Sequence, residues 1–141
     1  MPFCYVTLLL VSTLVFGEDK TKDHAQALAG CYEATVKSAA ALVHVPKRFM
    51  LLNEPIKDEQ PWFNVRVLGV KRDDFRYRHS GWKAAGKDSL VVGFNSGTAG
   101  SNLKLRRSGD ILVGTISASA DAGGQEPFHE YEVSIRRIAC P

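Results

Sequence analysis

The side chains that could support catalysis or metal binding are four scattered histidines and two glycine-rich stretches. The histidines are His24, His44, His79 and His129. None has the i, i+4 or His-x-His spacing that brings two imidazoles to one metal ion. Residues 93–97 carry Asn95 where a nucleophile elbow needs serine, and residues 97–101 lack the Lys-Ser/Thr ending of a phosphate loop. We therefore predict turns at both stretches, and no catalytic residue, metal site or cofactor.

Charged residues gather between positions 71 and 83. Asp73 and Asp74 are adjacent, but nothing around them indicates the burial that raises a carboxyl pKa for acid–base work. Basic and aromatic residues also interleave here, a composition found on surfaces that stack RNA bases. They are Lys71, Arg72, Arg76, Arg78 and Lys83, with Phe75, Tyr77 and Trp82. We interpret the segment as the solvated outer face of a strand with its aromatics inward, and predict no nucleic-acid partner.

The N-terminal residues indicate export. An apolar run from Val6 to Phe16 ends at Gly17 and is followed at once by charged residues. It is too short to cross a bilayer as a helix, and it has the length of a signal-peptide core. We predict a signal peptide over residues 1–17 and an extracellular or periplasmic protein, the alternative being a buried N-terminal strand. No later stretch is long and apolar enough to span a membrane.

Two cysteines follow the predicted signal peptide, Cys31 and Cys140. Cysteines in an oxidising compartment are expected to pair, and the alternative is two free buried thiols. The bond would close a loop over most of the chain, which the chain-entropy model values at about 4–5 kcal/mol.

The remaining chain suits a single domain. We predict a flexible segment over residues 18–29, with at most one helical turn stopped by Gly30, and a β-barrel domain over residues 30–141. The net charge of +3 bears on solubility more than on a partner, and the sequence indicates no oligomeric state.

Eight segments carry strand-like patterns, and several are joined by short turns. They are residues 31–36, 48–53, 63–70, 75–79, 89–95, 101–107, 111–120 and 130–138. This count predicts an all-β fold, a single antiparallel eight-stranded up-and-down barrel, with a two-sheet β-sandwich as the alternative. Closure of the barrel would bring the start of the first strand beside the end of the last. Cys31 and Cys140 both have outward parity, so their sulfurs would then meet outside the barrel.

The strand faces that point inward contain small residues, notably on residues 111–120. Such a face either lets neighbouring walls pack closely or leaves space, and an eight-stranded barrel can be filled or hold one small ligand. We nominate seven inward residues as the lining of a possible apolar site. They are Tyr32, Phe49, Leu90, Phe94, Leu105, Ile116 and Val133.

Gly30-Cys31-Tyr32 resembles the Gly-x-Trp opening of lipocalins, with Tyr32 where that family has tryptophan. In lipocalins an arginine near the end of the barrel packs over this aromatic ring, so the resemblance implies that role for Arg136 or Arg137. The chain is shorter than a usual lipocalin.

The sequence also resembles small exported bacterial proteins of unassigned function, through Gly-Cys-Tyr and much of the second half. The matching residues are 88–92, 96–97, 103–105, 109–115 and 136–140. This resemblance implies a fold and a compartment but no activity.

Two functional hypotheses follow. The first is an exported lipocalin-like protein that binds a small apolar ligand in the barrel interior. The second is an interaction module with a filled core, which binds an exported protein partner or an anionic surface through a basic stripe. The stripe would comprise Arg76, Arg78, Lys104 and Arg106. An enzyme is the least favoured option because no catalytic motif is present.

Overall fold

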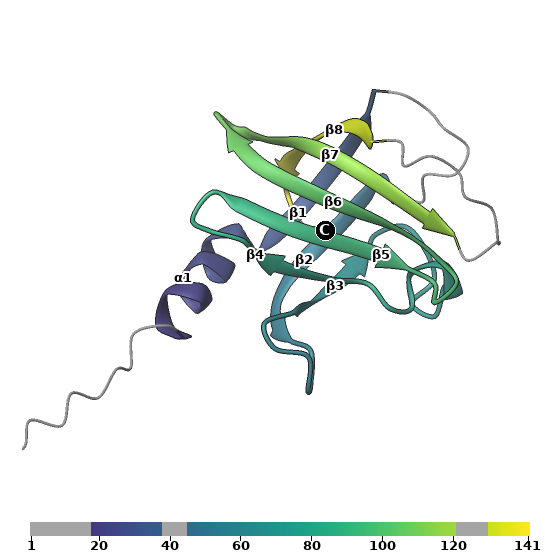
Figure 1. The fold of residues 1–141 in the computed structure, drawn as a ribbon, viewed down its shortest axis with the longest axis horizontal. Coiled ribbons are helices and arrows are strands. Elements are labelled where there is room, and N and C mark those ends of the chain that lie inside the picture. Colours follow the sequence, from purple (N-terminus) through teal and green to yellow (C-terminus); the bar gives the residue numbers. More distant parts are fainter. Residues whose placement is uncertain (1–17, 38–44, 121–129) are drawn as a thin grey trace, which may run out of the picture.

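The computed structural model describes residues 18–37, 45–120 and 130–141, which form a closed antiparallel barrel of eight strands (Figure 1). The elements are α1 (Glu18–Leu28), β1 (Gly30–Val36), β2 (Arg48–Pro55), β3 (Phe63–Val67), η1 (Phe75–Tyr77), β4 (Gly81–Ala84), β5 (Ser89–Asn95), β6 (Ala99–Ser108), β7 (Ile111–Ala120) and β8 (Glu130–Ile138). Each strand pairs with the next, and β8 pairs with β1. The predicted up-and-down barrel is confirmed and the sandwich alternative is excluded. The predicted signal peptide lies outside the described residues.

The core is built from alternate strand positions, as the period of two requires. The largest fully buried side chains are Trp82, Phe49 and Phe94. The Phe49 ring lies 6.1 Å from that of Tyr32 and 5.1 Å from that of Phe94, measured between centroids. The Trp82 indole donates a hydrogen bond to the Leu52 carbonyl at 2.9 Å, which satisfies its one polar atom.

The prediction of a strand at residues 75–79 is wrong. Residues 75–77 form the short 3₁₀ helix η1, and the fourth strand is Gly81–Ala84, which is not among the eight segments predicted as strands. The Asp74 carboxylate caps η1 by accepting from the Arg76 backbone N–H, and it also pairs with the Arg76 guanidinium. This turn chemistry outweighs the alternating pattern. Phe75 is consequently 66 % exposed, whereas Trp82 on β4 is fully buried.

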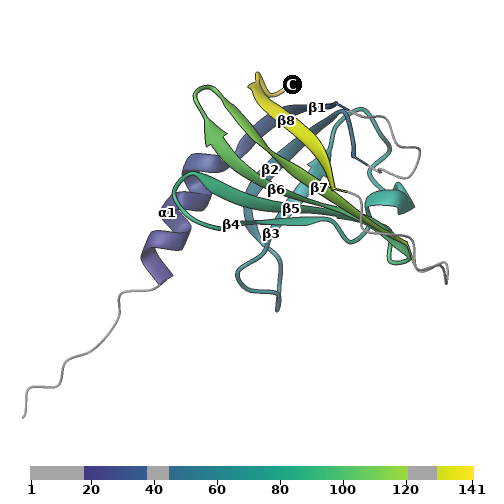
Figure 2. The same cartoon turned by 45° about the horizontal axis from the view of Figure 1, so that its top comes forward.

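Residues 18–28, predicted to be flexible, form the helix α1, which covers one end of the barrel (Figure 2). Ala25 and Leu28 on this helix are fully buried in the core cluster. The Tyr32 hydroxyl donates to the Leu28 carbonyl at 2.6 Å. A second side chain from the barrel, that of Arg137, also bonds a carbonyl at the end of α1.

Arg137 takes the position that the lipocalin resemblance implies. Its guanidinium lies 5.6 Å from the centroid of the Tyr32 ring and donates to the carbonyls of Ala27 and Ala29. A cation that bonds the last carbonyls of a helix satisfies orphan acceptors and opposes the helix dipole. Arg136 instead forms an exposed ion pair with Glu33 at 2.6 Å.

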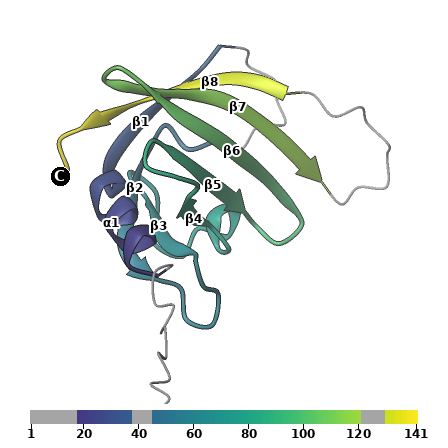
Figure 3. The ribbon, with the colours of Figure 1, turned by 60° about the vertical axis from the view of Figure 1, so that its left-hand side comes forward.

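The disulfide between Cys31 and Cys140 is confirmed, with the two Cα atoms 5.3 Å apart. Cys31 pairs across the sheet with Ile138, so Cys140 lies just beyond the end of β8. Figure 3 shows the C-terminal segment near the start of β1, to which the disulfide joins it. Although Cys31 has outward parity, its side chain is only 1 % exposed, whereas Cys140 is exposed.

Gly114 shows what one small residue on the inner face of β7 does. A Cβ built there would lie 1.8 Å from the Lys104 carbonyl oxygen on β6. The glycine therefore permits a close approach of two neighbouring backbones, and it is not there to open space for a ligand. Its neighbours on the same face, Leu112 and Ile116, are buried.

We expect a Cys31→Ser, Cys140→Ser double variant to be markedly less stable than the oxidised protein. The bond closes a loop with a sequence separation of 109 residues, and the entropy model assigns such a loop about 4–5 kcal/mol. In a domain of this size the loss corresponds to a fall in Tm of roughly 10–20 °C, measurable by calorimetry. Equal melting temperatures would contradict the role given to the bond.

We expect Arg137→Ala to destabilise the fold by about 1–2 kcal/mol, because it removes two charged hydrogen bonds and a cation–π contact at a partly solvated site. Arg137→Lys should restore little of this loss, since a lysine cannot reproduce the planar fork. Arg136→Ala is the matched control and should cost much less, because its ion pair is exposed. Urea unfolding measures all three, and similar losses for Arg136→Ala and Arg137→Ala would refute the assignment.

We expect Gly114→Ala to cost about 1–3 kcal/mol or more, because the new methyl group collides with backbone that must shift. Gly93→Ala is the control, on β5, which is separated from β7 by β6. There the nearest atom to a new Cβ is the Asn102 side-chain oxygen at 3.1 Å, which can move. Thermal unfolding that ranks the two variants equally would show that the close approach at Gly114 is unimportant.

Candidate functional site

The barrel wall is least complete between β3 and β4. These strands pair at two positions, Phe63 with Trp82 and Asn64 with Gly81. On its other side β3 pairs with β2 as far as Val67. The chain then turns at Gly69, whose φ of +79° suits glycine, and runs through η1 before it reaches β4. A wedge therefore opens between residues 65–67 of β3 and residues 70–80.

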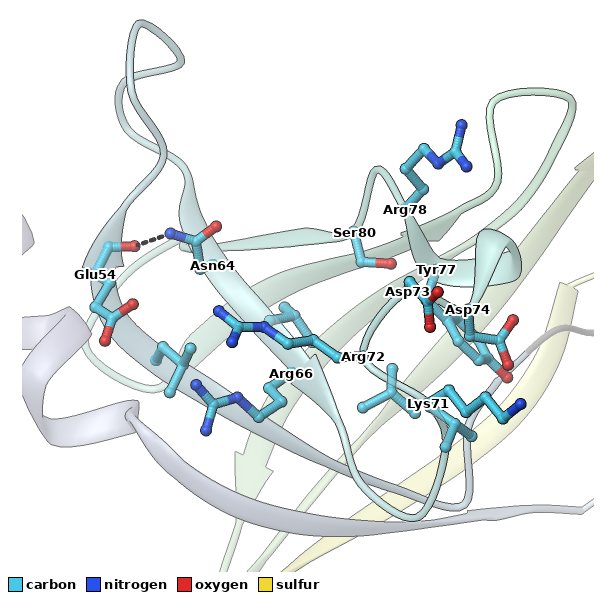
Figure 4. Close-up of a pocket in the computed structure, with 14 residues that line it drawn as sticks. Glu54, Asn64, Arg66, Lys71, Arg72, Asp73, Asp74, Tyr77, Arg78 and Ser80 are labelled. Carbon is cyan, nitrogen blue, oxygen red and sulfur yellow. Dashed lines mark hydrogen bonds between the residues drawn. The ribbon is translucent and has the colours of Figure 1, made fainter.

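A pocket of about 660 Å³ occupies this wedge, and we call it the seam pocket (Figure 4). Its lining residues are Leu52, Glu54, Asn64, Val65, Arg66, Val67, Val70, Lys71, Arg72, Asp73, Asp74, Tyr77, Arg78 and Ser80. The pocket thus combines an apolar patch with several charged side chains. Figure 4 shows the Arg66 and Arg72 side chains extending in the same direction across it.

The charges of the seam pocket are unbalanced. Four cationic side chains line it, and none has an ion-pair partner within the described ranges. They are Arg66, Lys71, Arg72 and Arg78. Of the three carboxylates, Asp74 is already paired with Arg76 at 2.6 Å, and the hydrogen bond from that guanidinium lowers the pKa of Asp74. Glu54 and Asp73 remain, so positive charge is in excess.

The apolar patch comprises Val65, Val67, Val70 and Tyr77. Val65 and Val67 pack against the core cluster, so the pocket reaches the inner side of the barrel wall. Tyr77 also borders the core, because its ring lies edge-on to Phe94 with 6.1 Å between centroids. Burial raises the pKa of the Tyr77 hydroxyl, which therefore remains a neutral group. An anion with an attached apolar group fits this combination of surfaces.

All seven nominated interior residues lie in one buried core cluster. Their exposed fractions range from 0 to 4 %. None of them lines the seam pocket, but two lining residues adjoin the group: Tyr77 packs on Phe94, and Val67 is the cross-strand partner of Phe49. A ligand among the seven residues therefore stays a prediction.

Among the residues whose burial the structure describes, Ser101 is the buried polar one, with 1 % of its surface exposed. It lies beside Phe94 on one side and Ala118 on the other. Its hydroxyl has no hydrogen-bond partner among the described residues, which is costly in an apolar core. This places one unsatisfied polar atom next to the nominated apolar set.

The four residues of the predicted basic stripe are divided between two regions. Arg76 and Arg78 belong to η1 and its C-terminal cap, whereas Lys104 and Arg106 are exposed on β6. Outward strand positions therefore do not join them into one stripe. Sequence reasoning found Lys71, Arg72 and Arg78 as a basic group but missed Arg66. The feature that could have associated Arg66 with this basic group is the turn at residues 69–74, which folds the group back toward β3.

No protein-family model, curated protein or solved structure matches this chain. Residues 18–37, 45–120 and 130–141 contain no group of three side chains suited to hold a metal ion. No helix in those ranges is long and apolar enough to cross a membrane. The disulfide is typical of proteins from oxidising compartments.

Proposed function

We propose that this chain is an exported, lipocalin-like binding protein for a small amphiphilic anion, which it takes up in the seam pocket. One observation carries the proposal. Where β3 loses its β4 partner, four cations without an ion-pair partner among the described residues surround an apolar patch that borders the barrel core.

The charge supports an acidic ligand. Arg66 and Arg72 extend together across the pocket, and each guanidinium presents a planar fork that matches a carboxylate. Two like charges on one concave surface repel each other, so an anion between them relieves repulsion as well as forming hydrogen bonds. Arg78 lies on a different segment of the lining and extends the positive field.

The apolar patch supports a ligand with a hydrocarbon body. The whole seam pocket, with a volume of about 660 Å³, is large enough for a small molecule. We place the charged end of the ligand at the guanidinium groups and its apolar part against Val65, Val67 and Tyr77. Displacement of the Tyr77 ring would connect this position with Phe94 and the predicted interior site.

The arrangement of the two barrel ends agrees with such a role. The helix α1 and Arg137 cover one end, while η1, the short teal helix in Figure 2, lies at the other. The Arg137–Tyr32 contact corresponds to the arginine and aromatic ring of the lipocalin resemblance. The disulfide agrees with export.

We expect laurate to bind more tightly than dodecanol, which has the same chain length without the charge. An Arg66→Gln, Arg72→Gln double variant should bind laurate at least about tenfold more weakly, since hydrogen bonds to charged groups contribute roughly 1.5–3 kcal/mol. Its affinity for dodecanol should change little. Isothermal titration calorimetry measures each affinity.

The matched control is Lys104→Gln, Arg106→Gln, which removes the same charge from β6, away from the pocket. It should leave laurate binding nearly unchanged. If the control lost as much affinity for laurate, the effect of the Arg66→Gln, Arg72→Gln variant would be due to the lower net charge alone. If the Arg66→Gln, Arg72→Gln variant bound laurate as tightly as the parent, the ligand would bind at another site, such as the predicted interior.

A further inference from the structure

A second hollow of about 350 Å³ lies on the outer face of the sheet, and we call it the outer pocket. Its floor crosses four strands at one level, because Asn64 on β3, Gly81 on β4, Gly93 on β5 and Asn102 on β6 are successive register partners. Three strand spacings separate the two asparagines, roughly 14 Å. The two central residues of this row are glycines, and the Asn102 side chain lies over one of them, with its oxygen 3.1 Å from where a Cβ of Gly93 would stand.

One wall of the outer pocket is the loop between β2 and β3. Hydrogen bonds from the Ile56 N–H to the Trp62 carbonyl and from the Trp62 N–H to the Glu59 carbonyl hold this loop in shape. Gly81 provides room beneath it, because a Cβ there would lie 3.0 Å from Ile56 Cδ1 and 3.4 Å from Trp62 Cε3. The Lys83 ammonium lies 4.9 Å from the centroid of the Trp62 ring. The indole is therefore held in place over the floor.

The opposite wall is also fixed before any ligand arrives. The His79 N–H donates to the Asn95 carbonyl at 2.9 Å, and the Gly97 N–H donates to the Asn95 side-chain oxygen at 2.6 Å. The second bond orients the Asn95 amide and leaves its NH₂ group available. A preformed site of this kind loses little conformational entropy when it binds a ligand.

The polar groups around the outer pocket are mostly neutral, and within the described part of the chain they have free hydrogen-bonding capacity. The Asn102 amide and the Trp62 indole N–H have no hydrogen-bond partner there, and Asn64 uses its NH₂ group on the Glu54 carbonyl while its oxygen stays free. The charged side chains in the lining, Glu59 and Arg78, have opposite signs. The outer pocket therefore lacks the excess of positive charge found in the seam pocket.

We infer that the outer pocket is a second binding site, and that its ligand is a neutral saccharide. Vicinal hydroxyls both donate and accept, and an amide side chain offers both functions in one plane. The C–H face of a sugar ring can pack on a fixed indole, while its hydroxyls reach the amides of Asn95 and Asn102. A hydrocarbon ligand would leave the surrounding amides unsatisfied. The inference goes beyond the proposed acid-binding role and does not depend on it.

The test follows the backbone amide resonances of the intact oxidised protein by NMR. Maltose, cellobiose and N,N′-diacetylchitobiose are titrated separately to millimolar concentrations. We expect at least one disaccharide to shift the resonances of Gly81, Gly93 and Asn102 and the indole resonance of Trp62. Asn102→Ala should then weaken binding about fivefold, the loss of one hydrogen bond. Gly93→Val should abolish binding, because a Cβ there already lies 3.1 Å from the Asn102 side-chain oxygen and the larger side chain displaces that amide.

Asn53→Ala is the matched control, since Asn53 is exposed on β2 and does not line the pocket. It should bind the disaccharide as the parent does. Gly93→Val should keep a dispersed spectrum, which shows that it is folded. Its affinity for laurate should equal that of the parent protein, whether or not the parent binds laurate. The proposal is overturned if none of the three sugars shifts these resonances, or if a folded Gly93→Val variant binds a sugar with unchanged affinity.

Discussion

The pairing of β1 with β8 is the constraint on which the rest of the structure depends. Six register pairs, from Cys31–Ile138 to Val36–Val133, turn a meander of consecutive hairpins into a closed cylinder. Without them both edges of the sheet would expose unpaired backbone groups. The disulfide and Arg137 act at the same place, since one joins β1 to the second residue after β8 and the other joins β8 to the end of α1. Closure, covalent linkage and the covering of one barrel end are thus concentrated in a single region.

Because the barrel is firmly closed between β1 and β8, it can stay folded with incomplete pairing between β3 and β4. At β3 and β4 the ladder has two register pairs, and the chain leaves the sheet through Gly69, η1 and Ser80 before it returns. Trp82 compensates for the missing ladder, because it is fully buried and its indole anchors β4 to the Leu52 carbonyl on β2. The backbone between Val65 and Val67 can therefore border a pocket without loss of the barrel. Both candidate sites adjoin this seam and share Asn64, Arg78 and Ser80.

Sequence reasoning succeeded where one local signal determines the outcome. Strict alternation located seven of the eight strands, and the shared outward parity of Cys31 and Cys140 predicted that barrel closure would bring them together. It failed at residues 75–84, because the alternation of Phe75 and Tyr77 resembles a strand more than Gly81–Ala84 does. The Asp74 cap and the burial of Trp82 decide this region, and neither has a periodic signature. The strand count was right because a wrongly placed strand substituted for the true one. The seam pocket was missed because Arg66 and Arg72 come to line the same pocket only through the turn at residues 69–74.

The packing of the interior explains why we locate binding at the barrel wall. An eight-stranded barrel is just wide enough for its own side chains or one small ligand. Here the rings of Tyr32, Phe49 and Phe94 follow one another at centroid distances of 6.1 and 5.1 Å. A ligand among them would have to displace packed aromatic side chains, each of which contributes roughly 1.5–3 kcal/mol by its burial. A ligand in the seam pocket meets already exposed guanidinium groups and needs no core residue to move. Tyr77 lies between the two locations, because its ring packs on Phe94 while it lines the seam pocket. Movement of that ring would therefore open one route for an apolar chain from the wall into the core.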